Sequence, residues 1–198
     1  MCIRDSRITV RGRPAHAGLD PTAGASAIAE LALVIQKLHA LTDLERGTTV
    51  NVGTIRGGTR ANVIAAEASA DVDVRVATLA DGEEITRTIH ALEPQTPGTS
   101  IHVEGSVGIP PLERTPRNLA LWSAAQTAGE RLGLELDHFM AGGGSDGNTT
   151  SQFTATLDGL GAVGDGAHAT HEQVSIDGMV ERAALLAELL MLPVPDCE

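Results

Sequence analysis

Asp71-Val72-Asp73-Val74-Arg75-Val76 is the stretch of sequence that decides the fold. Charged and apolar residues alternate along it, and the side chains of a β-strand point alternately to its two faces. The stretch therefore predicts a strand with one face of valines and one polar face. This pattern is typical of an antiparallel sheet that is covered on one side only, so we expect helices to pack on the valine face.

Five further elements surround this strand in the sequence. The spacing of apolar residues predicts strands at about 8–11, 50–52 and 101–103, and helices at about 20–39 and 81–92. Asp20 with Pro21 is a favourable helix start, and Asp81 with Glu84 resembles a capping box. The order strand, helix, strand, strand, helix, strand predicts an α+β domain of the ferredoxin-like, split βαβ type. This is a four-stranded antiparallel sheet with two helices on one face.

A second segment follows Pro110-Pro111, which we interpret together with Pro116 as a domain boundary. Its pattern predicts a helix at about 117–132, a strand at 134–139 and a closing helix that contains Val180 and Leu190. Alternating helices and strands favour parallel α/β structure. This segment contains too few strands to form a parallel sheet that is buried on both faces. We therefore expect the other strands of the sheet to lie elsewhere.

These patterns divide the chain into residues 8–110 and residues 111–198. Residues 1–7 fit no predicted element, and we interpret them as an unassigned segment or an artefact. The pattern begins abruptly at Arg7, which suggests that an N-terminal half precedes it in a longer protein.

The composition disfavours several classes of partner. With 14 basic and 26 acidic residues the formal charge is −12, which disfavours nucleic acid and anionic membrane surfaces. No apolar run reaches the ~20 residues of a membrane helix, and Met1–Ser6 contains no signal-peptide core. Cys2 and Cys197 have no neighbouring ligands, so two free thiols are favoured over a disulfide between the ends. We therefore expect a cytoplasmic protein.

Three stretches are richer in glycine, histidine and polar residues than packing requires, and Gly12–Gly18 is the first of them. It places His16 between small residues at a strand end, where the side chain could meet a ligand. The alternative is a solvated loop histidine.

The second stretch, Gly57–Ile64, precedes Arg75 on the polar face of the valine strand. A guanidinium in this position can bind a carboxylate through two parallel hydrogen bonds. The alternative is an ion pair with Asp71 or Asp73 on the same face.

The third stretch combines Gly142–Asn148 with Gly164–Glu172. Glycines let backbone amides approach a ligand, and a histidine after such a loop suits zinc. His168, His171 and Glu172 could supply some ligands, but a complete site must draw on other parts of the fold. A phosphate-binding loop is disfavoured because Gly-Lys-Ser/Thr is absent.

These stretches together resemble a known family. Arg13-Pro14-Ala15-His16-Ala17-Gly18, then Gly24-Ala25, then Arg60-Ala61-Asn62-Val63-Ile64 resemble the lid domain of the dinuclear zinc aminoacylase/carboxypeptidase family. The later stretches 142–148 and 157–168 are similar to its glutamate carboxypeptidase branch. The resemblance covers about Ile8 to Leu192. It implies a lid or dimerisation domain at 8–110, followed by the C-terminal part of an α/β zinc-peptidase catalytic domain.

The resemblance also implies roles for individual residues. His168 would be a zinc ligand, with Glu172 completing a His-x-x-x-Glu pattern, in a site that holds two zinc ions. His16 would polarise the scissile carbonyl or stabilise the oxyanion in the active site of a partner subunit. The remaining residues would bind substrate: Asn62 and Arg75 through its free carboxylate, and Gly143 and Gly144 through their backbone.

The family's other catalytic residues have no counterpart in this sequence. We therefore expect an inactive portion of an amidohydrolase that acts on a small molecule or peptide with a free carboxylate, such as a C-terminal glutamate or an N-acyl amino acid. The lid would make the enzyme a homodimer. The alternative is a non-catalytic dimerisation or binding module derived from the lid.

Overall fold

The computed structural model describes residues 2–192, with side chains for all of these except residues 2–5, 106 and 107. Cys197, one of the two predicted free thiols, lies outside the described residues. The chain divides into two compact units, Met1–Leu112 with Gly142–Gly144, and Glu113–Ala141 with Ser145–Glu198. No helix within residues 2–192 is long and apolar enough to cross a membrane.

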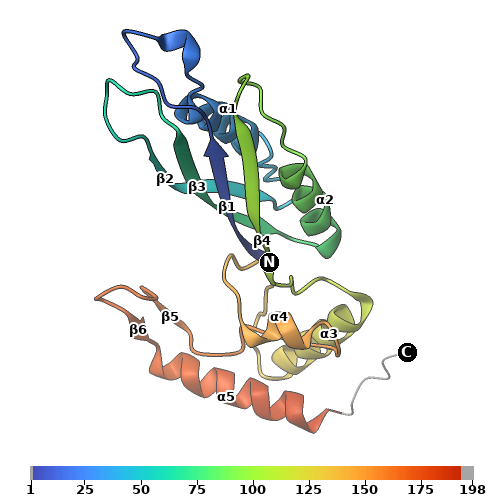
Figure 1. Ribbon diagram of the computed structural model, residues 1–198. Helices are drawn as coiled ribbons and strands as arrows, with labels where there is room; N and C mark the ends of the chain where they lie inside the picture. Colours follow the sequence, from blue (N-terminus) through green and yellow to red (C-terminus); the bar gives the residue numbers. More distant parts are fainter. Residues whose placement is uncertain (1, 193–198) are drawn as a thin grey trace. The chain divides into compact units, whose positions relative to one another are not determined.

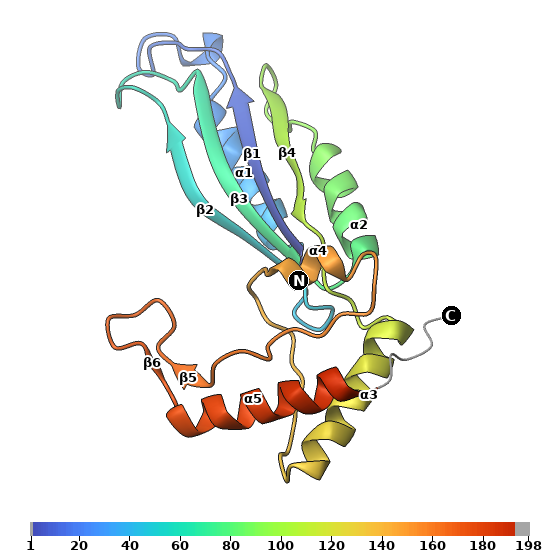
Figure 2. The same cartoon turned by 90° about the horizontal axis from the view of Figure 1, so that it is seen from below.

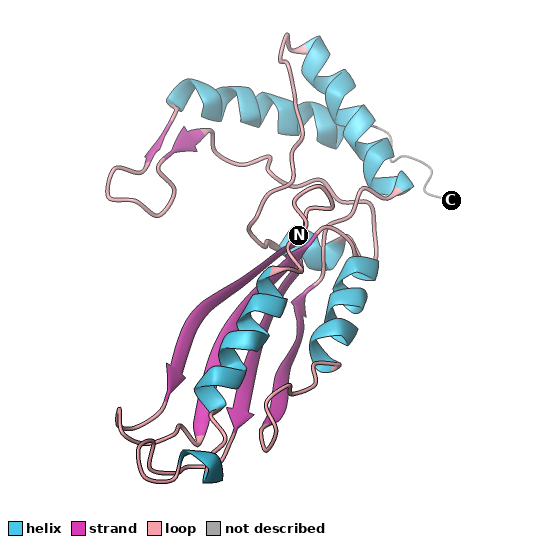
Figure 3. Cartoon of the chain, turned by 90° about the horizontal axis from the view of Figure 1, so that it is seen from above, coloured by secondary structure: helices cyan, strands magenta, loops and turns pink. Residues whose placement is uncertain are grey.

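The first unit contains the predicted four-stranded antiparallel sheet. Its strands are β1 (Cys2–Arg11), β2 (Thr49–Gly57), β3 (Glu67–Val76) and β4 (Ser100–Ile109), in the order β2-β3-β1-β4 (Figure 1). Two helices, α1 (Ala27–His39) and α2 (Leu79–His90), lie on the same face of the sheet (Figure 3). The predicted fold class and element order are confirmed.

The core lies between the sheet and the two helices. Along β3 buried residues alternate with partly exposed ones, as the decisive stretch predicts. The valines of β3 meet apolar side chains of β1, β2 and both helices, and the larger members of this core are Ile8, Val10, Leu31, Val34, Leu38, Val50, Val72, Val74, Val76, Ile85 and Ile89. Burial on this one face leaves the opposite face of the sheet polar.

The strand β1 is longer than the sequence pattern indicates. We predicted residues 8–11 as a strand and left residues 1–7 unassigned, but β1 begins at Cys2 and pairs with both β3 and β4. The polar run Arg4-Asp5-Ser6-Arg7 has no clear alternation. A central strand is held by backbone hydrogen bonds to two neighbours, which do not depend on side-chain pattern. The prediction that this segment opens no element is wrong.

Both helices begin at other residues than we predicted. Asp20-Pro21 opens only the short 3-10 turn η1 (Pro21–Ala23), and the extended backbone of Gly24 separates this turn from α1. Ser26 is the N-cap of α1, where its side chain accepts a hydrogen bond from the amide of Ala29 at 3.2 Å. An N-cap side chain satisfies a helix amide that has no other partner, which fixes the start of the helix.

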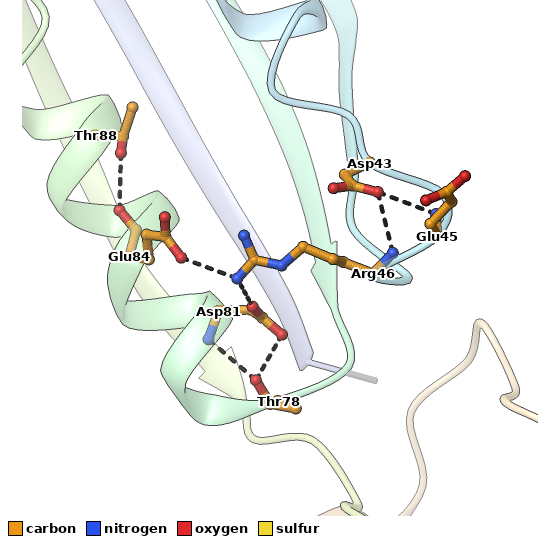
Figure 4. A network of polar contacts seen from close by, with 7 residues as sticks. All are labelled: Asp43, Glu45, Arg46, Thr78, Asp81, Glu84 and Thr88. Atoms are coloured by element: carbon orange, nitrogen blue, oxygen red, sulfur yellow. Dashed lines mark hydrogen bonds and ion pairs between the residues drawn. The ribbon is translucent and has the colours of Figure 1, made fainter.

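The N-cap of α2 is Thr78 rather than Asp81. The Thr78 hydroxyl accepts a hydrogen bond from the Asp81 amide at 3.1 Å and donates one to the Asp81 carboxylate at 2.6 Å (Figure 4). Arg46, from the loop before β2, binds both Asp81 and Glu84, the latter at 3.0 Å. Two acidic groups on α2 therefore hold this loop against the start of the helix.

The second unit contains α3 (Pro116–Arg131), α4 (Asp146–Thr150), α5 (Ile176–Met191) and the two-residue strands β5 (Gly164–Asp165) and β6 (Gln173–Val174). Its described residues form no strand at 134–139 and no parallel pairing, because β5 and β6 are antiparallel. The strand prediction is wrong, since a strand needs a neighbour for its backbone groups. Ile176, Val180 and Leu190 leave an exposed apolar stripe along α5.

Candidate functional site

His16 lies in the loop between β1 and α1, and its ring is oriented by backbone amides. Its Nδ1 accepts hydrogen bonds from the amides of Gly18 at 3.2 Å and Leu19 at 3.1 Å. A neutral imidazole has one accepting and one donating nitrogen, so the proton lies on Nε2. The side chain is exposed. His16 therefore presents an N–H donor to the surroundings of the loop.

Asn62 lies beside His16 although it belongs to the loop between β2 and β3. The backbone carbonyl of Asn62 accepts a hydrogen bond from the amide of Ala17 at 3.0 Å, and His16 forms an isolated β-bridge with Val63. Both loops lie at the same end of the sheet (Figure 2). Two of the predicted site residues are thus brought together by the fold.

Arg75 lies near the other end of β3. Its Nε donates a hydrogen bond to the carboxylate of Asp73 at 2.9 Å, and its Nη1 contacts the carbonyl oxygen of Gly142. Of the two acidic partners suggested by the sequence, Asp73 is the one used. Asp71 instead binds Arg7 at 2.9 Å. The ion pair with Asp73 thus stays within β3, and the contact with the Gly142 carbonyl joins β3 to the glycine run Gly142–Gly144.

The glycine run presents open backbone next to Arg75. Gly142–Gly144 pack with the first unit. A Cβ on Gly143 would meet no atom within 4 Å, so the backbone is open on the side where a side chain would lie. Arg75, Gly143 and Gly144 thus form a second group of predicted site residues.

One chain does not bring Asn62 and Arg75 to the same carboxylate. From Glu67 to Arg75 the strand β3 rises by roughly 26 Å at ~3.3 Å per residue. Asn62 precedes the start of β3 at Glu67 and is bound to the His16 loop there. A carboxylate spans only a few ångströms. If both residues contact one substrate, they must come from two copies of the chain.

His168 has an unusual backbone conformation. It lies in the loop that joins β5 to β6, and within the described part of the chain it is the one non-glycine residue with positive φ, at 67°. Such a conformation costs free energy and is concentrated at functional sites. Its side chain is exposed. Nearby His171 differs, because its ring packs over Gly166, where an added Cβ would lie 2.8 Å from His171 Cδ2.

Among residues 2–192, no three His, Cys, Asp or Glu side chains lie close enough to share a metal ion. Zinc needs three or four protein ligands. His168 and Glu172 are exposed neighbours on one loop and could supply at most two. The described residues therefore do not form a complete zinc site by themselves.

Two features of the site can hardly be predicted from the sequence. The amides of Gly18 and Leu19 set the tautomer of His16, but any residue type carries an amide. The close backbone approach at Gly12, where an added Cβ would lie 3.0 Å from the nitrogen of Ala27, was also not predicted. A glycine directly after a strand is the only indication of it.

The chain matches a family model described as "Peptidase dimerisation domain" over residues 3–95. A probable carboxypeptidase of Paracoccidioides brasiliensis is 34% identical over 124 residues, which cover 54% of this chain and 28% of that protein. Carboxypeptidase G2 of Pseudomonas sp. is 25% identical over 193 residues, which cover 93% and 46%. The chain thus spans about half, or less, of the length of the curated relatives it matches.

Solved structures share the fold over nearly the whole chain. Aminopeptidase PepT from Bacillus cereus superposes with a TM-score of 0.82 at 25% identity, covering 95% of this chain and 51% of that one. The YXEP protein of Bacillus subtilis, described as a dinuclear metal binding peptidase from the M20 family, has a TM-score of 0.70 at 19% identity, covering 95% and 49%. At that identity the likeness to YXEP concerns the fold alone.

Proposed function

We propose, from the membership of residues 3–95 in the peptidase dimerisation domain family, that the chain is part of a homodimeric, zinc-dependent amidohydrolase. The reaction is hydrolysis of an amide bond in a small molecule or peptide with a free carboxylate, such as a C-terminal glutamate or an N-acyl amino acid. Relatives described as carboxypeptidases support this reaction class. The observation that carries the proposal is the Nε2–H donor of His16, held outward beside Asn62.

The role of His16 follows from its tautomer. Attack on an amide carbonyl produces an oxyanion, which a preorganised N–H donor stabilises by ~3 kcal/mol, or about a hundredfold in rate. Nε2 of His16 is such a donor, because two backbone amides already occupy Nδ1. The same ring also polarises the carbonyl before attack.

The separation of Asn62 from Arg75 supports a site shared by two chains. In a homodimer, the Arg75 of one chain and the Asn62 and His16 of the other could meet at one substrate. The edge strand β2 is suited to pairing, because Ile55 on β2 is 64% exposed and Ile28 on neighbouring α1 is 47% exposed. Apolar side chains at an open sheet edge favour association with a second copy.

His168 contributes one zinc ligand in this proposal. Its strained, exposed loop position supports the assignment, while His171 packs over glycine. The remaining ligands and the general base would come from residues outside this sequence, in keeping with relatives about twice as long. Bound zinc would supply Lewis acidity and an activated water. The 198 residues alone are therefore expected to be inactive.

A non-catalytic dimerisation module is the second candidate. It is favoured by the extent of the family match, which covers residues 3–95 only, and by the lack of a complete metal cluster within residues 2–192. The two candidates differ in one measurement. A longer protein containing this sequence should hydrolyse N-acyl amino acids in a zinc-dependent manner, whereas a module would dimerise without hydrolysis.

Mixing two inactive variants of such a longer protein tests the shared site. His16→Ala and His168→Ala chains should each be inactive as homodimers. After mixing, half of the dimers contain one chain of each kind, and each of these has one intact site, so about a quarter of wild-type activity per total site should return. Full activity of the His16→Ala homodimer would reject the role of His16. Loss of activity without recovery on mixing would place His16 in the site of its own chain.

A further inference from the structure

The two loops that carry His16 and Asn62 are joined by a ladder of backbone hydrogen bonds. Three bonds connect the loops directly: from Gly12 to the carbonyl of Ala66 at 2.8 Å, from Ile64 to that of Ala15 at 2.9 Å, and from Ala17 to that of Asn62 at 3.0 Å. Backbone hydrogen bonds fix both the position and the direction of the chain segments that they join. The turn at His16 is therefore held in one position against the β2–β3 loop.

The His16 loop is closed at its base by a second backbone contact. Arg13 and Ala25 exchange two hydrogen bonds of 2.9 Å, which bring the end of the loop back onto its start. Gly12 lies directly before this pair. A Cβ on Gly12 would overlap the carbonyl oxygen of Ala25 and lie 3.0 Å from the nitrogen of Ala27. Both atoms belong to the backbone, so no change of side-chain rotamer could relieve the overlap.

We propose that Gly12 is a positioning residue for His16, and this inference rests on the function proposed above. Because residue 12 has no side chain, Arg13 and Ala25 can form their two hydrogen bonds. The backbone hydrogen bonds between the two loops then position the turn at His16. That turn directs the amides of Gly18 and Leu19 to Nδ1 of His16. The absence of a methyl group at Gly12 thus determines which nitrogen of His16 carries the proton.

A methyl group at residue 12 would separate Arg13 from Ala25 and shift the loop. Nδ1 of His16 would then lose its two amide donors, and the ring would populate both neutral tautomers. The tautomer with Nδ1–H leaves Nε2 as an acceptor, which repels an oxyanion instead of stabilising it. Catalysis would fall although the imidazole is still present.

Selective 15N labelling of the seven histidines, followed by NMR of the whole chain, tests the proposal without any need for activity. In the parent chain the ring nitrogens of His16 should show a single tautomer, with the proton on Nε2. In Gly12→Ala they should show a mixture of both tautomers, while the amide spectrum of β1–β4 keeps its dispersion. Gly161→Ala is the matched control, because a Cβ there meets nothing within 4 Å, and it should leave His16 unchanged.

A milder variant covers the case in which Gly12→Ala does not fold. A Cβ on Gly24 would overlap Cδ1 of Ile64 and lie 3.1 Å from Cβ of Ala15, at the middle of the ladder. Gly24→Ala should therefore shift the His16 signals. Adding Ile64→Val removes Cδ1 and should return them toward the parent values.

Each outcome decides the proposal. A folded Gly12→Ala chain with a single, unchanged His16 tautomer would overturn it, as would a Gly24→Ala chain without a shift if Gly12→Ala does not fold. In a longer, active protein, Gly12→Ala should lower kcat with KM nearly unchanged, by less than the roughly hundredfold that complete loss of one oxyanion donor costs, because part of the rings keep Nε2–H. Full activity of His16→Ala would refute the proposed function alone, since the tautomer result is independent of it.

Discussion

Replacement of the buried carboxylate of Glu30 is the sharpest test of how the first unit is held together. Glu30 lies in α1, is fully buried, and accepts hydrogen bonds from the amides of Gln95 at 3.0 Å and Thr96 at 2.6 Å. These amides belong to the loop between α2 and β4. A single side chain therefore fastens a loop from a distant part of the sequence to the helix.

The expected loss of stability in Glu30→Gln follows from the two hydrogen bonds that Glu30 accepts. A hydrogen bond to a charged group contributes about 1.5–3 kcal/mol, and an unsatisfied buried donor costs about 1–3 kcal/mol. Glu30→Gln retains one acceptor oxygen but directs an NH₂ group toward the second amide. Part of this loss is offset because a charge no longer has to be buried. We expect the free energy of unfolding to fall by about 2 kcal/mol.

The pH dependence has a defined sign. Burial raises the pKa of Glu30, but hydrogen bonds from Thr96 and Gln95 outweigh burial, so the pKa lies below its usual value. A lowered pKa contributes stability above the unfolded value of ~4.3, and this contribution is lost as pH falls through the folded pKa. The difference between the parent chain and Glu30→Gln should therefore shrink in acid.

Urea unfolding followed by far-ultraviolet circular dichroism measures the change, and hydrogen exchange at the amides of Gln95 and Thr96 reports it locally. Glu83→Gln is the control, because Glu83 is exposed on α2, and it should alter stability by less than about 0.5 kcal/mol. An equally small effect of Glu30→Gln, with unchanged exchange at both amides, would refute the reasoning.

Three further predictions concern the proposed site and one helix cap. In a longer protein containing this sequence, His168→Ala should lower zinc content and activity together, measured by metal analysis and turnover, whereas His171→Ala should leave both unchanged; the reverse pattern would contradict the ligand assignment. Arg75→Lys should raise KM for a carboxylate-bearing substrate about tenfold with little change in kcat, because lysine cannot form two parallel bonds; an unchanged KM would exclude Arg75 from substrate binding. Thr78→Ala should cost about 1 kcal/mol in urea unfolding through loss of the α2 cap, and no loss would contradict the capping role.

The sequence by itself determined the fold of the first unit and its resemblance to a peptidase dimerisation domain. Alternation in β3 and the spacing of apolar residues in two helices are local properties, and they follow from how side chains leave a strand or a helix. The resemblance carried by the motifs around His16 and Asn62 is confirmed by the family match over residues 3–95. Local pattern sufficed because each of these features depends on near neighbours in the chain.

Tertiary structure decided what depends on distant backbone. The first half of β1 forms because β3 and β4 supply hydrogen bonds on both sides, and residues 134–139 form no strand where such neighbours are missing. Asn62 and Arg75 are close in sequence, yet an extended strand places them at opposite ends of the sheet. The tautomer of His16 is likewise fixed by the folded loop, since it depends on where two amides point and not on which residues carry them.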